Sequence, residues 1–469
     1  MTWRLADVVR ATGADVHARG AAASFSGVAT DSRRLAAGAL FVALRGERFD
    51  AHHFLAEAVA AGATGVVVER VPADLDVAGG IAVLVVPDTL RALQDLAADL
   101  RRRLAPCVLA VTGSNGKTTT KEMLAAILAA AGGAAGVLKT PVNLNNLIGV
   151  PLTLLRLTGG ERHAVVEMGM NAPSEIWRLA EIADPDVGVI TNVAPAHLEG
   201  LGSVAGVARA KGELFARMRR SAVAVVNADD PHVAALGDAF PGRAVRFAIE
   251  GDPATAEVGA EDVRVDAHGT AAFRLRVAGA TADVHLRIAG RHNVANALAA
   301  AAAAHAVGVG VEAVVAGLGA ALPVGSRMRV CALASGVTVV DDTYNANPAS
   351  VAAALRSLRE VPARRRIAVL GDMLELGAAS GELHHAIGRL AAEIGLDALY
   401  LFGEHAAATV AGARAVDAGF ARDVVQVLPS HAAIAAAVSA TARAGDWVLV
   451  KGSRGQRMEE VVRLLGAAD

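Results

Sequence analysis

The chain has 469 residues, of which 54% are hydrophobic and 20% charged, and this length and composition predict two to four domains with buried cores. Its 45 Lys and Arg residues nearly balance its 47 Asp and Glu residues, so the net charge of −2 gives no support to a nucleic-acid partner. Two cysteines cannot form a disulfide framework and fit a reducing, cytoplasmic compartment. We expect no signal peptide and no transmembrane segment, because no apolar run reaches the ~18 residues that a membrane span needs.

The first predicted segment, residues 1–105, alternates helix and strand patterns. The runs AVAAGATGVVVER (58–70) and IAVLVVPDTLRALQDLAADLRRR (81–103) each combine a short β-rich stretch with a helical one. The charged, proline-ended stretch RRRLAP at 101–106 is typical of an exit between domains. We therefore expect a small N-terminal α/β domain.

The second predicted segment, residues 106–322, contains repeated apolar runs separated by helical patterns. Such runs indicate a mostly parallel sheet covered by helices on both faces. Alternating polar and apolar residues between 255 and 290 predict antiparallel strands added to that sheet. The alanine-rich stretch that follows RHN at 291–293 predicts a buried helix and not a membrane span. The four apolar runs are CVLAVT (107–112), HAVVEM (163–168), DVGVIT (186–191) and AVAVVN (222–227).

The third predicted segment, residues 323–469, has four further strand-like runs with helices between them. Each run ends in a polar residue or glycine, and ligands of open α/β sheets bind at the carboxyl ends of strands. We expect a third, doubly wound α/β domain. The runs are GVTVVDD (336–342), RIAVLGD (366–372), ALYLFGE (398–404) and DWVLVKG (446–452).

The stretch VTGSNGKTTTKEM, residues 111–123, predicts a phosphate-binding loop between a strand and a helix. Backbone N–H groups of the glycine turn and the helix N-terminus would hold phosphate oxygens. Lys117 would neutralise the β- and γ-phosphates, and the Thr118 hydroxyl would hold Mg²⁺. The usual spacing places its first glycine where this chain has Val111, so the loop is a variant. A glycine turn with a solvated lysine is the simpler alternative.

Several polar residues follow predicted strands, but each has an ordinary structural explanation when it is taken alone. Glu167 can be an exposed strand-end carboxylate, His197 a structural loop histidine, and Lys211 a solvated helix charge. If their strands are neighbours, Glu167 and His197 would lie at the same sheet edge as the phosphate loop. A carboxylate and an imidazole there could bind one or two Mg²⁺ ions.

The Gly-x-x-Gly-Lys-Thr loop and the motifs after it resemble those of the Mur ligase superfamily, which includes folylpolyglutamate synthases. The resemblance extends over all three segments and implies an N-terminal uridine-nucleotide domain, a central P-loop ATPase domain and a C-terminal Rossmann-like domain. It implies catalytic roles for Lys117, Glu167, His197, Lys211 and Arg327, and ATP contacts from Gly113, Ser114, Asn115, Gly116, Lys117, Thr118, Thr119, Asn293, Asn296, Arg327 and Asp342.

The resemblance also implies two Mg²⁺ ions held by Thr118, Glu167, His197 and Lys211, with Lys211 carbamylated so that it becomes carboxylate-like. In VVDDTYNANPASV, Tyr344 and Asn347 accompany Asp342, whose counterpart in the family contacts ribose; Asn347 also suits the start of a helix. Members join an amine to a carboxylate through an acyl phosphate, with ATP as the phosphoryl donor.

Three stretches resemble the member that adds D-alanyl-D-alanine to UDP-N-acetylmuramoyl-tripeptide: TDSRRLAAGALFVALRGERFDAHHF (30–54), KTPVNLNNLIGVPLTLLRL (139–157) and LGDMLELG (370–377). We expect substrate contacts from Ser32, Arg33, Asn143, Asn145 and Asn146, with a solvated loop as the alternative for each. The chain departs from its relatives at 141–142 and 170–176, near the expected substrate side.

Two other functions stay open at this point. A sister ligase that adds a single amino acid would use the same ATP chemistry, but the Asp-Asn-Pro-Arg stretch of the diaminopimelate-adding ligase is missing. A catalytically silent nucleotide-binding partner would have lost Lys117, Glu167, His197 or Lys211, and all four are present. We expect a monomer.

Overall fold

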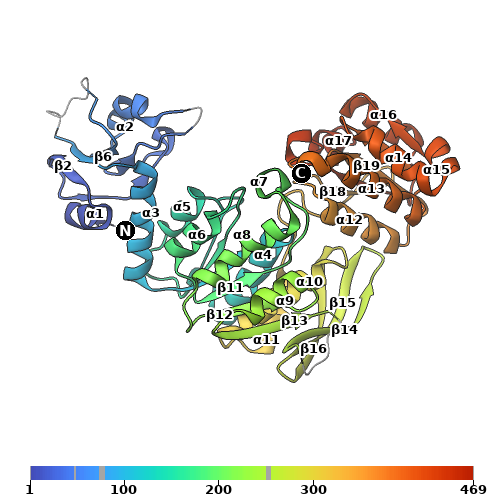
Figure 1. Ribbon diagram of the computed structural model, residues 1–469, viewed down its shortest axis with the longest axis horizontal. Helices are drawn as coiled ribbons and strands as arrows, with labels where there is room; N and C mark the ends of the chain where they lie inside the picture. Colours follow the sequence, from blue (N-terminus) through green and yellow to red (C-terminus); the bar gives the residue numbers. More distant parts are fainter. Residues whose placement is uncertain (1, 47–48, 73–79, 250–254, 468–469) are drawn as a thin grey trace. The chain divides into compact units, whose positions relative to one another are not determined.

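A computed structural model describes residues 2–46, 49–72, 80–249 and 255–467 (Figure 1). The chain forms two compact units. The first contains residues 1–108, 138–168 and 178–185, and the second contains residues 109–137, 169–177 and 186–469. This division differs from the three predicted segments, whose boundaries after residues 105 and 322 stay a prediction.

A five-stranded sheet with the order β2-β7-β6-β5-β4 organises the N-terminal part of the first unit. Strands β4 to β7 are parallel, and β2 pairs antiparallel with β7 at one edge. Helix α3 begins after Asp88, whose carboxylate accepts a hydrogen bond from the Arg91 N–H and satisfies one of the free donors of the helix end. It ends at Leu104, with Ala105 as the C-cap, within the predicted charged exit. The bounds are α1 Leu5–Thr12, β2 Asp15–Ala18, β4 Val28–Ala29, β5 Leu40–Val42, α2 Leu55–Ala60, β6 Gly65–Val68, β7 Ala82–Val85 and α3 Thr89–Leu104.

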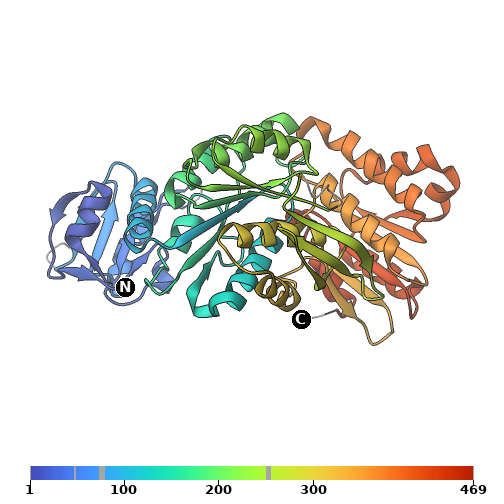
Figure 2. The same cartoon turned by 90° about the horizontal axis from the view of Figure 1, so that it is seen from below.

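A nine-stranded sheet has the order β16-β15-β14-β13-β12-β11-β8-β10-β9. Pairing from β8 through β11, β12 and β13 to β14 is parallel, whereas β14, β15 and β16 are joined antiparallel. The predicted parallel sheet with antiparallel additions is therefore confirmed (Figure 2). The bounds are β8 Cys107–Thr112, β9 Val137–Lys139, β10 His163–Glu167, β11 Val187–Ile190, β12 Val223–Asn227, β13 Arg243–Ala248, β14 Val258–Val265, β15 Thr270–Val277 and β16 Ala280–Ala289.

Helices α4 and α10 bury apolar side chains in the core around the nine-stranded sheet. In α4 (Lys117–Gly132) the apolar side chains of Met123, Leu124, Ile127 and Leu128 are fully buried. The alanine-rich stretch forms α10 (Asn293–Ala306), which packs against α4 and is buried along most of its length, as predicted. Three further helices are α8 Val204–Arg217, α9 Pro231–Asp238 and α11 Val311–Ala320.

A six-stranded sheet, in the order β17-β18-β22-β19-β20-β21, forms the C-terminal part, and all four predicted strands are present. Successive residues of one strand face opposite sides: Leu370 packs with one hydrophobic cluster and Val369 with the other. Helices cover both faces, so the predicted doubly wound arrangement is confirmed. The bounds are β17 Arg329–Ala332, β18 Thr338–Asp342, α12 Pro348–Glu360, β19 Arg366–Gly371, α13 Ser380–Ile394, β20 Ala398–Phe402, α14 Ala406–Val416, β21 Val425–Val427, α16 His431–Thr441, β22 Trp447–Lys451 and α17 Glu459–Leu464.

Among the described residues, no helix combines the length and apolar character needed to cross a membrane. The predicted α/β fold class with mostly parallel sheets is confirmed.

Candidate functional site

The phosphate loop lies between β8 and α4, as the sequence predicts. Gly113 and Gly116 have φ angles of +148° and +81°, a region that favours glycine. A Cβ on Gly113 would overlap the Thr191 side chain, and one on Gly116 would overlap the Asn296 side chain. The two glycines are therefore needed both for the turn itself and for the close packing around it.

Residues that follow β11 hold the loop in shape. The Ser114 N–H donates to the Asn192 carbonyl at 2.9 Å, and the Asn115 N–H donates to Asn192 Oδ1 at 3.0 Å. Thr191 Oγ1 donates to the Asn115 carbonyl at 2.6 Å. Thr191 and Asn192 are not among the predicted site residues, although the Thr-Asn pair at the end of a predicted strand was the available signal.

Lys117 is the first residue of α4, and its side chain folds back onto the loop. Its Nζ donates to the carbonyls of Gly113, at 2.8 Å, and Ser114, at 3.3 Å. The ammonium group is thereby held at the turn where phosphate oxygens are expected. Thr118 is buried and Thr119 is half-buried on the first turn of the same helix.

Lys211 lies on α8 and is only 2% exposed. Burial, together with the positive charge of Lys117, lowers its pKa well below the ordinary lysine value. Desolvation disfavours the ammonium form, so a larger fraction of this amine is neutral, and therefore nucleophilic, than in a surface lysine. A neutral amine is the form that can react with carbon dioxide, so the environment of Lys211 fits the predicted carbamate.

His197 precedes the short helix α7 (Leu198–Leu201) and has a left-handed backbone with a φ of +53°. Its Nδ1 lies 2.7 Å from Oε2 of Glu375, a residue of the C-terminal part. This hydrogen bond is the main cause of a lowered pKa for the Glu375 carboxyl group. Glu375 was not among the predicted site residues, although it lies in the motif LGDMLELG.

Glu167, in the first compact unit, is the last residue of β10 and is only 1% exposed. Its Oε1 accepts a hydrogen bond from Asn145 Nδ2 at 2.8 Å, and its N–H donates to Thr140 Oγ1 at 2.9 Å. The structure thus brings together a predicted metal ligand and a predicted substrate residue. It also shows that Glu167 is buried, in contrast to the alternative of an exposed strand-end carboxylate.

The other predicted substrate residues lie outside the sheets, with Ser32 and Arg33 in a short 3-10 helix (Ser32–Arg34). Asn146 Oδ1 accepts from the Gly149 N–H at 2.8 Å and helps to start α5 (Gly149–Leu154), while Asn143 is exposed. Arg33 forms a salt bridge with Asp31 at 2.8 Å, beside the half-buried Ser32. These partners are compatible with either substrate binding or ordinary loop structure.

Asn293 and Asn296, two of the predicted ATP-contacting residues, lie at the start of α10, and both are buried. Asn293 Nδ2 donates to the Ala289 carbonyl at 2.7 Å, and Asn296 Nδ2 donates to Asn293 Oδ1 at 2.8 Å. Asn296 packs against Gly116, so the hydrogen-bonded Asn293 and Asn296 side chains support the phosphate loop.

The C-terminal residues Asp342, Tyr344 and Asn347 contact several charged and polar groups. The Arg327 guanidinium carbon is 3.7 Å from the Tyr344 ring centroid, which is cation–π geometry. Asp342 forms a salt bridge with the buried Lys451 at 2.6 Å, a partner that the sequence analysis missed. Asn347 caps α12, and its Nδ2 donates to the side chain of Asn115 in the phosphate loop at 2.8 Å.

Within the described ranges, no cluster of three or more His, Cys, Asp or Glu side chains is arranged to hold a metal ion. The predicted set Thr118, Glu167, His197 and Lys211 contains only two such residues, and they belong to different compact units. The metal ligands therefore stay a prediction, supported by the burial of Glu167 and by the chemistry of Lys211.

Comparison with known proteins gives matches along the chain. Residues 24–101, 111–304 and 326–454 match the Mur ligase catalytic domain, the Mur ligase middle domain and the Mur ligase glutamate ligase domain, respectively. The UDP-N-acetylmuramoyl-tripeptide–D-alanyl-D-alanine ligase of Escherichia coli K12 is 42% identical over 449 residues, with 95% of each chain covered.

Solved structures agree. MurF from Acinetobacter baumannii has a TM-score of 0.89 at 35% identity, with 99% of this chain and 98% of that chain covered. The MurF ligase from Thermotoga maritima in complex with ADP has a TM-score of 0.81 at 30% identity, with 93% and 96% covered.

Proposed function

This chain belongs to the Mur ligase family, and from that premise we propose that it joins D-alanyl-D-alanine to UDP-N-acetylmuramoyl-tripeptide in peptidoglycan precursor synthesis. The observation that carries the proposal is 42% identity to a ligase of that name over 95% of both chains. The reaction is ATP-dependent and forms ADP, and the ADP complex of the Thermotoga maritima relative supports the nucleotide. The phosphate loop described above supplies the expected place for it.

The proposed chemistry has two steps. A carboxylate oxygen of the tripeptide attacks the γ-phosphorus of ATP, ADP leaves, and an acyl phosphate forms. The amine of D-alanyl-D-alanine then attacks the acyl carbon, loses a proton and displaces inorganic phosphate, leaving an amide. Both steps depend mainly on positioning and on stabilising negative charge.

The chain's own residues would share this work. Lys117 and the loop N–H groups would hold the phosphates, and Arg327 would neutralise charge on the γ-phosphate. Asn293, Asn296 and Asp342 would bind the nucleoside side of ATP. We assign the ATP-contacting loop to Gly113, Ser114, Asn115, Gly116, Lys117, Thr118 and Thr119.

We propose Thr118, Glu167, His197 and Lys211, the last as a carbamate, as holders of two Mg²⁺ ions. When bound, the ions would neutralise phosphate charge and align the transferring group. The carbamate forms when the Lys211 amine adds to carbon dioxide and releases a proton, which changes a potential cation into an anion. Burial lowers the pKa of the Lys211 amine and so favours the neutral form that this reaction needs.

On the substrate side we propose Ser32, Arg33, Asn143, Asn145 and Asn146. The proposed domains are a UDP-substrate domain at 1–105, an ATP-binding domain at 106–322 and a C-terminal ligase domain at 323–469. We further propose a monomer that works in the cytoplasm, where nucleotide-linked precursors are made.

The test measures phosphate released from ATP and Mg²⁺ with UDP-muramoyl-tripeptide, and compares D-alanyl-D-alanine with lysine, diaminopimelate and no amine. Release only with the dipeptide is expected. Release with a single amino acid would instead assign the sister ligase activity, and release with none would contradict the amide ligase. Lys117→Ala should lower turnover about 10²–10³-fold, the effect of removing one charge-stabilising group, whereas Arg422→Ala, which removes an exposed basic side chain outside the proposed site, is the control.

A further inference from the structure

We infer that Glu375 is a positioning residue for the ligase reaction: its carboxylate fixes the His197 ring so that the opposite ring nitrogen faces a metal ion. The inference rests on the proposed function, in which His197 is a metal ligand. It adds a residue of the C-terminal part to a site that the sequence assigns to the central segment.

The ring geometry supports this role. His197 Nδ1 and Glu375 Oε2 are 2.7 Å apart, and a carboxylate can only accept, so Nδ1 carries the hydrogen. Nε2 then has the free lone pair that a metal needs. Metal-binding histidines commonly donate their second ring nitrogen to a carboxylate, which fixes the tautomer and raises the basicity of the ligand nitrogen.

The backbone around this contact is unusual on both sides. His197 and Glu375 have φ angles of +53° and +62°, left-handed conformations that cost about 1–3 kcal/mol for a residue other than glycine. A second bond joins the same two segments, from the Glu199 N–H to the Glu375 carbonyl at 3.2 Å. The two segments are therefore joined by a backbone hydrogen bond as well as by the side-chain contact.

Stability does not explain this arrangement. The side chains of Glu375 and His197 are 59% and 25% exposed, and an ion pair at such a surface contributes only about 0–1 kcal/mol. That gain is no larger than the cost of two left-handed residues. Positioning of a functional group gives the contact a purpose that stability alone does not.

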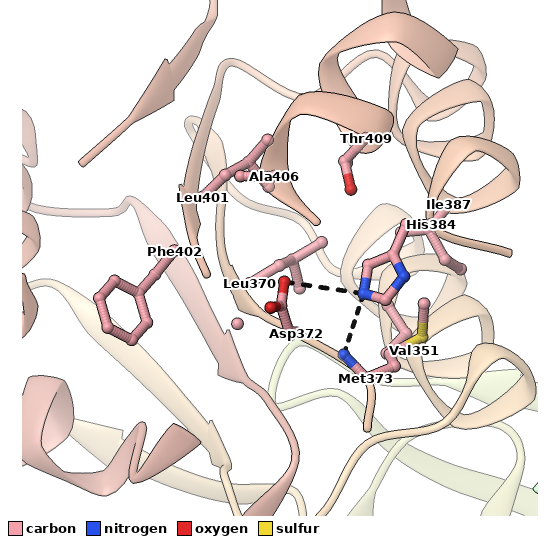
Figure 3. A pocket seen from close by; sticks show the side chains of 11 residues that line it. Val351, Leu370, Asp372, Met373, His384, Ile387, Leu401, Phe402, Ala406 and Thr409 are labelled. Carbon is pink, nitrogen blue, oxygen red and sulfur yellow. Dashed lines mark hydrogen bonds and ion pairs between the residues drawn. The ribbon is translucent and has the colours of Figure 1, made fainter. Parts of the chain in front are cut away.

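The chain preceding Glu375 is fixed by its neighbours. The Met373 N–H donates to His384 Nε2 at 3.0 Å, and Figure 3 shows the same nitrogen of this buried ring in contact with the Asp372 carboxylate. The next N–H, of Leu374, donates to Ser453 Oγ at 2.9 Å. Two successive backbone anchors thus determine where the Glu375 side chain begins, which suits a carboxylate that has to orient another group.

The test uses Mn²⁺ as a spectroscopic substitute for Mg²⁺ and measures its binding to the full chain with ADP, by electron paramagnetic resonance. Loss of such a partner typically weakens metal binding 10–100-fold, so Glu375→Ala should raise the Mn²⁺ dissociation constant by about that factor. Glu375→Gln keeps an oxygen acceptor and should recover part of the affinity. Glu199→Ala removes an exposed carboxylate from the adjacent segment and should match the wild type.

A double-mutant cycle with His197→Ala separates this role from a general effect of charge. If Glu375 acts through His197, Glu375→Ala has little further effect once the ring is absent. Equal Mn²⁺ affinity of wild type and Glu375→Ala would overturn the inference while leaving the proposed function intact. Failure of the wild type to bind Mn²⁺ with ADP would overturn the metal assignment and the inference together. Thermal melts of all variants check that each is folded.

Discussion

Replacing Lys211 gives the sharpest test of the proposed metal chemistry. The side chain is 2% exposed, and burial lowers the pKa of its amine well below the ordinary value. A lysine with only a structural role would destabilise the fold at this position, because its charged form is poorly solvated there. A carbamate that binds Mg²⁺ would give the same burial a catalytic reason.

The expected size of the effect follows from this burial. Charges act strongly where water is excluded, and removal of one group that stabilises transition-state charge typically costs about 3–4 kcal/mol. Lys211→Ala should therefore lower turnover by at least 10²–10³-fold. Lys211→Met, which keeps an apolar chain of similar length, should lose activity equally while its melting temperature stays equal to or above that of the wild type.

The assay is phosphate release with both substrates present, repeated with added formate or acetate. A small carboxylate can occupy the space left by Lys211→Ala, so partial recovery is expected there and not in Lys211→Met. Wild-type protein kept in ¹³C-bicarbonate should show a carbamate carbon signal that is absent from both variants. Full activity of Lys211→Ala, or wild type without the ¹³C signal, would refute the carbamate.

Three further predictions concern the loop, its C-terminal contact and pH. Gly116→Ala places a Cβ in the Asn296 side chain at a φ of +81°, so nucleotide affinity measured by calorimetry should fall ~5–150-fold, the equivalent of about 1–3 kcal/mol. Wild-type affinity would contradict the loop geometry. Asn347→Ala should lower the free energy of unfolding by about 1 kcal/mol and raise the KM for ATP. Asn347→Asp keeps the helix cap but loses the amide donor to Asn115, so its melting temperature should return to the wild-type value while its KM stays raised. Burial lowers the pKa of His384, so on acidification the unfolded chain binds a proton before the folded chain does. The free energy of unfolding should therefore fall as pH drops below about 6.5. Urea titrations at pH 7.5 and 5.5 should show a smaller loss of stability for His384→Asn than for the wild type, and an equal loss would contradict this.

Local patterns were enough to predict most of the fold. Residues 107–112 and 366–372 are continuous apolar runs followed by a turn and a helix, and each forms a buried parallel strand. The alanine-rich α10 was predictable because alanine favours helix and is small enough to pack closely. Local propensity and tertiary packing agree in these segments, so the pattern alone identifies them.

The site was predictable only where chemistry and local motif coincide. Lys117 sits in a strand–loop–helix context that the sequence displays directly. Asn192 and Glu375 lie in recognisable stretches, but these stretches do not reveal their partners, which are 77 and 178 residues away in the chain. Those pairings depend on which strands are neighbours and on how two segments meet, and neither is encoded in a short window.

The departure from the usual phosphate-loop spacing has a structural explanation. Val111, where the usual pattern has its first glycine, is a fully buried residue of β8 opposite Val189 of β11. The strand therefore runs to Thr112, and the sharp turn starts at Gly113, whose φ is +148°. A shorter turn has fewer residues to determine its own shape, which is consistent with the bonds that Asn192 makes to it. The variant loop and the residues after β11 thus form one structural unit, which we propose as the phosphate site; residues that follow the neighbouring strand help to shape the shorter turn.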